Sequence, residues 1–274
     1  MQNPLDRALY HPLATRIARF LVPTPVTPNM VSVAGGAAIV AAGLLYTRLD
    51  WPTSAMLGLL AHMAWHVLDG ADGDLARLTG RTSTLGEVID GLSDYLGHVV
   101  LYLLLGVFAY PMLGPPAWFL AVAAGFSRIV QANFYEVQRR QFLHWAYGVG
   151  WLRTSGTGGP AWLRGIRAVY LGGGEILAPR YPQIDEALDD PHRADALRHR
   201  LQALGPRPFT GGTLLGANYR TLALGLSMFA GSPVWFFIYE ATILNLVLIF
   251  AAWRARKKLG EVAAGLQSQP NTSR

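Results

Sequence analysis

Two pairs of aspartates stand close together in the sequence, and each pair has the spacing of one helical face. Asp69 and Asp72 lie three residues apart, and Asp90 and Asp94 lie four residues apart. Both pairs border strongly apolar runs, where a charged side chain is costly and is usually retained for function. Carboxylate oxygens are ligands of hard divalent cations, so two facing pairs predict a four-carboxylate, two-metal site.

Residues with small side chains accompany the aspartates on the same two faces. Gly73 and Ala76 continue the stripe of the first pair, and Ser83 and Gly86 precede the second pair. Small side chains allow a ligand to approach the helix backbone closely. The two stripes, placed face to face, therefore predict room for a phosphorylated ligand whose negative charge divalent cations would neutralise.

The complete pattern reads D-x2-D-G-x2-A-R-x8-G-x3-D-x3-D, and it resembles the signature of the CDP-alcohol phosphotransferase (CDP-alcohol phosphatidyltransferase) family. All eight specified positions match, namely Asp69, Asp72, Gly73, Ala76, Arg77, Gly86, Asp90 and Asp94. The resemblance implies an integral membrane transferase of phospholipid biosynthesis that is a homodimer and uses two divalent cations, Mg²⁺ or Mn²⁺. It implies transfer of a substituted phosphate from a CDP-linked donor to an alcohol hydroxyl, with release of CMP.

The resemblance also implies a role for each motif aspartate. Asp69, Asp72 and Asp90 carry over as metal ligands. Asp94 carries over as the catalytic general base, which takes the proton of the acceptor hydroxyl, and as a further metal ligand.

A second group of residues is expected to bind the CDP-linked donor; it consists of Asn29, Ser32, Gly73, Ala76, Arg77, Ser83 and Gly86. Arg77 would bind phosphate oxygens through its fork of donors. Asn29 and Ser32 belong to a Pro-Asn-x-x-Ser segment that resembles one common in the family, where they would bind the cytidine side. Either residue could equally cap the first long helix, because short polar side chains are common at that position.

Two arginines fall inside apolar runs and are candidates for binding the acceptor or a lipid phosphate. They are Arg128 and Arg220. The alternatives are an internal ion pair, such as Arg220 with Glu240, or a side chain that extends to the nearby membrane surface.

The apolar runs predict an all-α integral membrane protein with six transmembrane helices. The expected spans cover residues 30–48, 53–72, 89–110, 117–137, 213–231 and 234–252. A long polar insertion over residues 138–212 separates spans four and five, and it contains one expected short helix near Ala194–Leu204. We expect one membrane-embedded domain over residues 1–274.

The N-terminal residues predict an amphipathic helix on the membrane surface. They contain no uninterrupted apolar run of the kind that signal peptides have, so a signal peptide is not expected. The side chains expected to face the lipid are Leu9, Leu13, Ile17, Phe20 and Leu21.

Charge and composition restrict both topology and function. Of 23 lysines and arginines, only Arg48 would lie on the side opposite to the others, apart from Arg128 and Arg220 within spans. Both termini and the mouth of the aspartate site are therefore expected in the cytoplasm, which for a bacterium means the inner membrane. The basic residues do not form an aromatic-rich platform, so no nucleic acid partner is expected. The absence of cysteine excludes disulfides and thiolate sites.

The sequence leaves the substrates open. A CDP-diacylglycerol donor with a small polar alcohol is favoured, and a CDP-amino alcohol donor with a diacylglycerol acceptor is the alternative. Gly91 departs from the second branch, where a histidine commonly follows this aspartate. An ion-coupled membrane transporter is the alternative from another class, because intramembrane acids also mark ion pathways.

Overall fold

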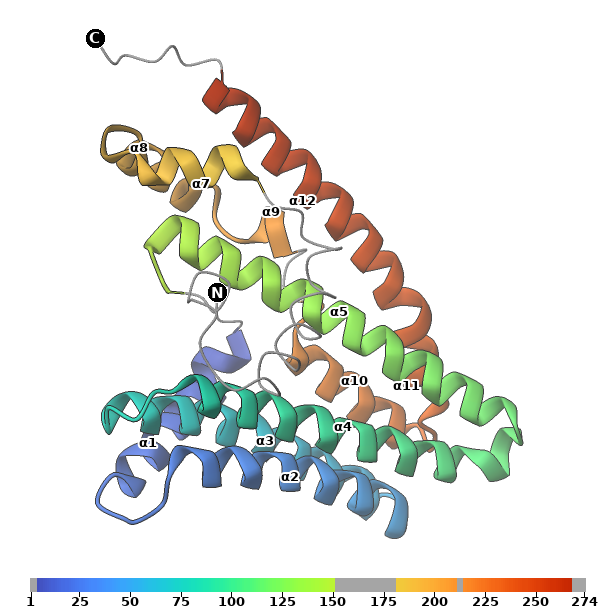
Figure 1. Ribbon diagram of the computed structural model, residues 1–274. Coiled ribbons are helices and arrows are strands. Elements are labelled where there is room, and N and C mark those ends of the chain that lie inside the picture. The colour runs from blue at the N-terminus through green and yellow to red at the C-terminus, as the bar shows by residue number, and fades with distance from the viewer. Residues whose placement is uncertain (1–3, 151–180, 211–213, 268–274) are drawn as a thin grey trace. The chain divides into compact units, whose positions relative to one another are not determined.

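The computed structural model describes residues 4–150, 181–210 and 214–267. Every regular element in these three ranges is a helix (Figure 1), which confirms the all-α prediction. The chain divides into two compact units, of which the first comprises Met1–Phe126 with Ala217–Ala241. The second comprises Ser127–Gly216 with Thr242–Arg274.

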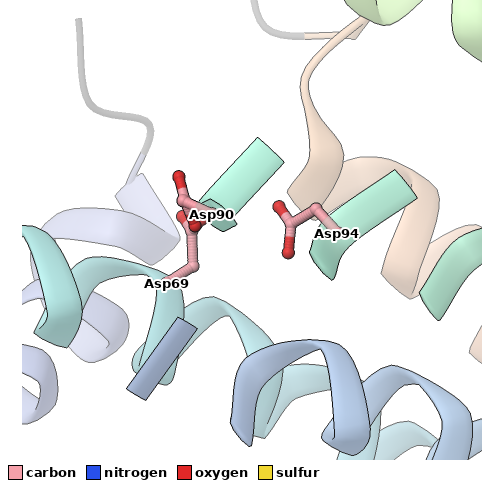
Figure 2. Close-up of side chains that lie close together, drawn as sticks. All are labelled: Asp69, Asp90 and Asp94. Carbon is pink, nitrogen blue, oxygen red and sulfur yellow. The ribbon is translucent and has the colours of Figure 1, made fainter. Parts of the chain in front are cut away.

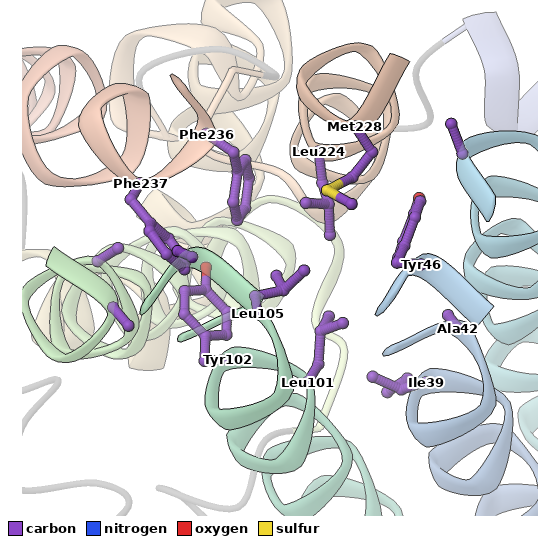
Figure 3. Close-up of a cluster of buried hydrophobic side chains, with 14 of the residues drawn as sticks. Ile39, Ala42, Tyr46, Leu101, Tyr102, Leu105, Leu224, Met228, Phe236 and Phe237 are labelled. Carbon is purple, nitrogen blue, oxygen red and sulfur yellow. The ribbon is translucent and has the colours of Figure 1, made fainter. Parts of the chain in front are cut away.

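Three long helices form the frame of the first unit. α2 (Pro28–Arg48) packs against both α3 (Thr53–Leu78) and α4 (Thr84–Leu113), and α10 (Ala217–Phe229) packs against α3. Inside a bilayer, close packing rather than exclusion from water is what holds such helices together, because lipid tails are as apolar as the side chains. The largest shared cluster (Figure 3) includes Ile39, Tyr46, Leu101, Tyr102, Leu105, Leu224, Met228, Phe236 and Phe237.

The backbones of α2 and α4 touch at two glycines. A Cβ added to Gly36 would lie 2.8 Å from the carbonyl oxygen of Ser93, and one added to Gly97 would lie 2.9 Å from the carbonyl oxygen of Gly36. No side chain fits in either place, so these glycines allow the close approach. The contact fixes the position of the part of α4 that carries Asp90 and Asp94.

The N-terminal segment forms a π-helix, η1 (Asp6–Tyr10), followed by α1 (His11–Leu21), which packs against α3. Its buried side chains are Tyr10, Ala14 and Ala18. They share a cluster with residues of α2 and α3, namely Val31, Val67, Ala71 and Leu75.

A helix with one side more apolar than the other lies in the expected N-terminal segment, but the side expected to face lipid is only partly exposed. Its position on the membrane surface stays a prediction. Leu13 and Phe20 are exposed, as predicted. Leu9, Ile17 and Leu21 instead pack against the buried cluster. The reason is the small size of Ala14 and Ala18, which lets α1 lie close to α3 and brings the flanking side chains into contact with it.

The second unit contains a small helical core built around α12 (Leu244–Gln267). α12 packs against α7 (Pro182–Asp189) and α9 (Arg207–Thr210), and α7 packs against α8 (Pro191–Leu204). The C-terminal part of α5 (Pro116–Tyr147) supplies further side chains. The main members of this core are Phe142, Trp145, Ile184, Leu197, Leu201, Phe209, Leu259 and Val262.

The expected insertion over residues 138–212 therefore has more regular structure than predicted. Residues 138–147 continue α5, and most of 182–210 is helical. The helix expected near Ala194–Leu204 is confirmed as part of α8, which begins at Pro191 after the Asp190 cap. α7 and α9 were not expected, because their few apolar side chains form too weak a pattern, and tertiary packing stabilises them. Residues 151–180 lie outside the described residues.

Helices lie at all six expected spans, but only three segments in the described residues are both long and apolar enough to cross a membrane. They are Pro28–Arg48, Leu85–Leu113 and Val234–Leu266, the last of which comprises α11 (Val234–Ile238), η2 (Tyr239–Ile243) and α12. The polar side chains of α3 and α5 lower their hydropathy, and α10 has only 13 residues. Three such segments indicate a membrane protein, whereas the six-span topology stays a prediction.

Candidate metal and nucleotide site

Three of the four motif aspartates converge from α3 and α4. Asp69 lies on α3, Asp90 and Asp94 lie one turn apart on α4, and one carboxylate oxygen from each lies within 4.8 Å of the others (Figure 2). None of the three is buried, so a ligand can reach their oxygens. Carboxylates this close repel one another unless a cation or a proton lies between them. An all-oxygen set of this kind fits a hard divalent cation such as Mg²⁺ or Mn²⁺.

Asp72, the fourth motif aspartate, is more deeply placed. It is 6% exposed, and the Ser32 hydroxyl donates to its Oδ2 at 2.5 Å. The side chain of Asp90 also lies beside Asp72. Asp72 therefore adjoins the cluster of Asp69, Asp90 and Asp94 at Asp90. Ser32, which was expected to bind the cytidine side of the donor, instead donates its hydroxyl to Asp72.

Asp94 has a partner that the sequence pattern did not indicate. Trp65 Nε1 donates to Asp94 Oδ1 at 2.6 Å, and His98 Nδ1 lies 2.8 Å from the Asp94 carbonyl oxygen. Trp65 precedes Asp69 by one helical turn on α3. This i, i+4 spacing from Asp69 is the only sequence signal that could have identified Trp65 as a neighbour of the site.

Three of the residues expected to bind the donor meet where α2 and α4 begin. A Cβ added to Gly86 would lie 3.2 Å from Ser83 Oγ and 3.4 Å from Asn29 Oδ1. Ser83 is the cap of α4, because its hydroxyl accepts from the backbone N–H of Gly86 at 3.0 Å. The cap of α2 is Thr27, so the alternative in which Asn29 or Ser32 serves as that cap is wrong.

The comparison with known families bears on the stretch that contains this site. Residues 25–148 match the sequence profile described as CDP-alcohol phosphatidyltransferase. Over this stretch the chain is similar to that family. The matched residues include α2, α3 and α4, which carry every aspartate of the motif.

Three curated relatives resemble parts of this chain. The bifunctional IPC transferase and DIPP synthase of Thermococcus kodakarensis is 32% identical over 52% of this chain and 31% of its own length. The archaetidylinositol phosphate synthase of Aeropyrum pernix is 34% identical over 33% of this chain and 47% of its own length. The phosphatidylinositol phosphate synthase of Streptomyces avermitilis is 30% identical over 37% of this chain and 41% of its own length. This chain therefore spans less than half the length of each relative.

The end of α3 presents the family's motif arginine to the surface. Arg77 is exposed and forms an ion pair with Asp74 at 2.6 Å, and Asp74 also accepts from the Thr15 hydroxyl at 2.6 Å. Burial raises the pKa of Asp74, but the Thr15 hydroxyl and the Arg77 guanidinium outweigh it and hold the pKa below its ordinary value. A Cβ added to Gly73 would lie 3.4 Å from Arg77 Nη1, so Gly73 leaves room for that side chain. Ala76 is half-buried beside it.

The two arginines expected inside spans have different surroundings. Arg220 is 1% exposed and forms an ion pair with Glu240 at 2.8 Å. The internal pair that was the alternative to phosphate binding is therefore present. Arg128 lies half-buried on the part of α5 that belongs to the second unit.

Proposed function

We propose that the protein is an integral membrane transferase of phospholipid biosynthesis. It transfers a substituted phosphate from a CDP-linked lipid donor to the hydroxyl of a small polar alcohol and releases CMP. The observation that carries this proposal is the convergence of Asp69, Asp90 and Asp94 within the stretch that matches the family.

In the proposed reaction, Asp69, Asp72 and Asp90 hold two divalent cations, Mg²⁺ or Mn²⁺, and Asp94 is a further ligand. The bound cations supply charge neutralisation for the diphosphate of the donor. Arg77 binds a phosphate oxygen through its fork of N–H donors. Asn29, Ser83 and Gly86 lie together at the start of α2 and α4, where they form the donor-side wall. Gly73 and Ala76 leave space along α3, and Ser32 acts through Asp72.

Asp94 is the proposed general base. It takes the proton of the acceptor hydroxyl as that oxygen attacks the β-phosphorus of the donor. A new P–O bond forms, the bond between the β-phosphorus and the bridging oxygen breaks, and the electron pair leaves with CMP. Asp94 suits this role because its carboxylate faces the same space as Asp69 and Asp90 (Figure 2).

The names of two relatives support a narrower substrate proposal. They describe synthases of archaetidylinositol phosphate and phosphatidylinositol phosphate. We therefore propose a CDP-diacylglycerol-type donor and an inositol phosphate acceptor. Arg128 is a candidate for the acceptor's phosphate, and Arg220 is paired with Glu240.

The proposed enzyme is a single membrane-embedded domain with six transmembrane helices and is a homodimer. Both termini and the mouth of the aspartate site lie in the cytoplasm. The charge distribution supports this orientation, because almost all lysines and arginines fall on one side of such a topology.

Purified protein should be incubated with radiolabelled CDP-diacylglycerol or CDP-choline, Mg²⁺ and a panel of alcohols that includes inositol phosphate, glycerol phosphate and serine. We expect a phosphatidylinositol phosphate product and stoichiometric CMP with the first donor. Product formation only from CDP-choline and diacylglycerol would reverse the donor assignment. CMP-dependent consumption of the lipid product would distinguish a transferase from an ion-coupled transporter, which has no reason to catalyse it.

A further inference from the structure

Trp65 on α3 binds the carboxylate of a residue on another helix, at the site of the proposed chemistry. Its Nε1 lies 2.6 Å from Asp94 Oδ1. An indole N–H is a donor only, and it does not titrate in the physiological range. The Asp94 carboxylate therefore keeps this partner whatever its own charge.

The Trp65 ring is itself held by its surroundings. It is 4% exposed, and the ring of His98 on α4 meets it edge-on with 4.7 Å between the centroids. His98 is also tied to the Asp94 backbone, because its Nδ1 lies 2.8 Å from that carbonyl oxygen. On the side of α2, a Cβ added to Gly35 would lie 3.5 Å from Trp65 Cδ1. A ring packed by all three helices has one orientation, so the direction of its N–H is set before any ligand binds.

We propose that Trp65 is the positioning residue of Asp94, a role that rests on the proposed transferase function. The terminal torsion of an aspartate side chain has a broad energy minimum, so a carboxylate without a fixed partner samples many orientations. Trp65 restricts Asp94 to one of them, in which the carboxylate faces Asp69 and Asp90 (Figure 2). A general base acts only within hydrogen-bonding reach of the proton it takes, and small misplacements lower the rate strongly.

The first test is the Trp65→Phe variant, which keeps a ring in the pocket and removes the N–H. We expect kcat to fall by roughly 10- to 100-fold, with little change in KM for the donor, because a hydrogen bond to a charged group is lost in the catalytic step. Trp145→Phe is the matched control, since Trp145 is equally buried and its Nε1 donates to Asp185 at 2.7 Å in the second unit. A merely structural role would lower the melting temperature of both variants and leave kcat unchanged. A kcat within twofold of the wild type for folded Trp65→Phe would overturn the proposal.

The second test measures the contact between Trp65 and Asp94 by NMR, without turnover, and changes Asp94 while Trp65 stays in place. In protein labelled with ¹⁵N-tryptophan and held in lipid nanodiscs, the Trp65 indole peak is assigned by its loss in Trp65→Phe. Asp94→Ala should shift this peak and leave the Trp145 peak in place. An unmoved Trp65 peak would overturn the proposal whatever the enzyme does. A further outcome is that Asp94→Ala shifts the Trp65 peak while the wild-type protein forms no product from any donor. That combination would support the contact and refute the transferase function.

Discussion

Asp94 faces Asp69 and Asp90 with a carboxylate, and an amide in its place would keep the shape but could not take a proton. We expect Asp94→Asn to lower product formation by about 100-fold or more, because general base catalysis contributes roughly that much. Binding of the CDP-linked donor should change little. The control is Asp195→Asn, since Asp195 is 84% exposed on α8 and stands outside the motif. Turnover of Asp94→Asn within threefold of the wild type, at saturating metal, would refute the base assignment.

Asp69 and Asp90 are expected to act as ligands, so their loss should affect metal and activity together. Asp90→Asn replaces a charged oxygen with a neutral amide, which weakens the attraction for a divalent cation. We expect a higher Mn²⁺ requirement for activity and weaker Mn²⁺ binding measured by calorimetry. Excess EDTA should abolish the wild-type activity, and added Mg²⁺ or Mn²⁺ should restore it. Full activity in EDTA would exclude the two-metal reading.

Asp74 gives a prediction for pH. Its pKa is lowered in the folded protein by Thr15 and Arg77, so the charged carboxylate stabilises the fold at pH values above its ordinary pKa of about 4. This stabilisation is lost as the pH falls through the lowered pKa. Asp74→Asn should therefore melt at a lower temperature than the wild type near pH 7, and the difference should shrink as the pH approaches 3. A difference that is constant over this range would contradict the assignment.

The sequence predicted that motif aspartates converge but did not predict their partners, for a physical reason. Ligand pairs on one helix have fixed spacings of three or four residues, which a sequence displays directly. Trp65 and Asp94 lie 29 residues apart on different helices, and Ser32 and Asp72 lie 40 apart. No spacing rule joins such pairs, because only the packing of α2, α3 and α4 brings them together.

At the scale of the helices, the glycine contacts between α2 and α4 can be tested with a single methyl group. In Gly97→Ala the new Cβ would lie 2.9 Å from the Gly36 carbonyl oxygen, so the backbones must separate. We expect a loss of about 1–3 kcal/mol in stability, together with lower activity because Asp90 and Asp94 move. Gly91→Ala on the same helix is the control, since a Cβ there meets nothing within 4 Å. Gly91→Ala should melt at or above the wild-type temperature, because alanine favours helix. Equal melting temperatures for the two variants would contradict the close contact.

Helices with long apolar runs were predictable, whereas the bounds of helices with mixed sequences, and the presence of α7, were not. α2 matches its expected span closely, whereas α3 extends beyond residue 72 to Leu78 and α4 covers Thr84–Leu113 in place of 89–110. A span predicted from the sequence ends where polar residues begin. The helix itself can continue past that point, because its hydrogen bonds and its packing do not depend on hydropathy. The same reason explains α7 and α8. Their few apolar side chains, such as Ile184 and Leu201, become a core only through contact with other helices.

At the scale of the whole molecule, the orientation in the membrane can be tested cleanly because the chain contains no cysteine. Arg81→Cys lies in the exposed turn between α3 and α4, and Asp50→Cys lies in the exposed turn between α2 and α3. We expect an impermeant maleimide to label only the second from outside intact cells. Arg81→Cys should become labelled once the inner membrane is permeabilised. Labelling of Arg81→Cys alone in intact cells would reverse the orientation.

The direct contact of the α2 and α4 backbones also bears on how this protein could be redesigned. Asn29 lies at one end of that contact surface and Asp94 lies near its middle, so both belong to one stiff body. Under the proposed function, mutational libraries aimed at a new acceptor alcohol should therefore spare α2 and α4, together with α3 and its aspartates, and vary the remaining helices. If the proposed roles hold, such variants would keep the chemical step and nucleotide binding together while the acceptor alcohol changes.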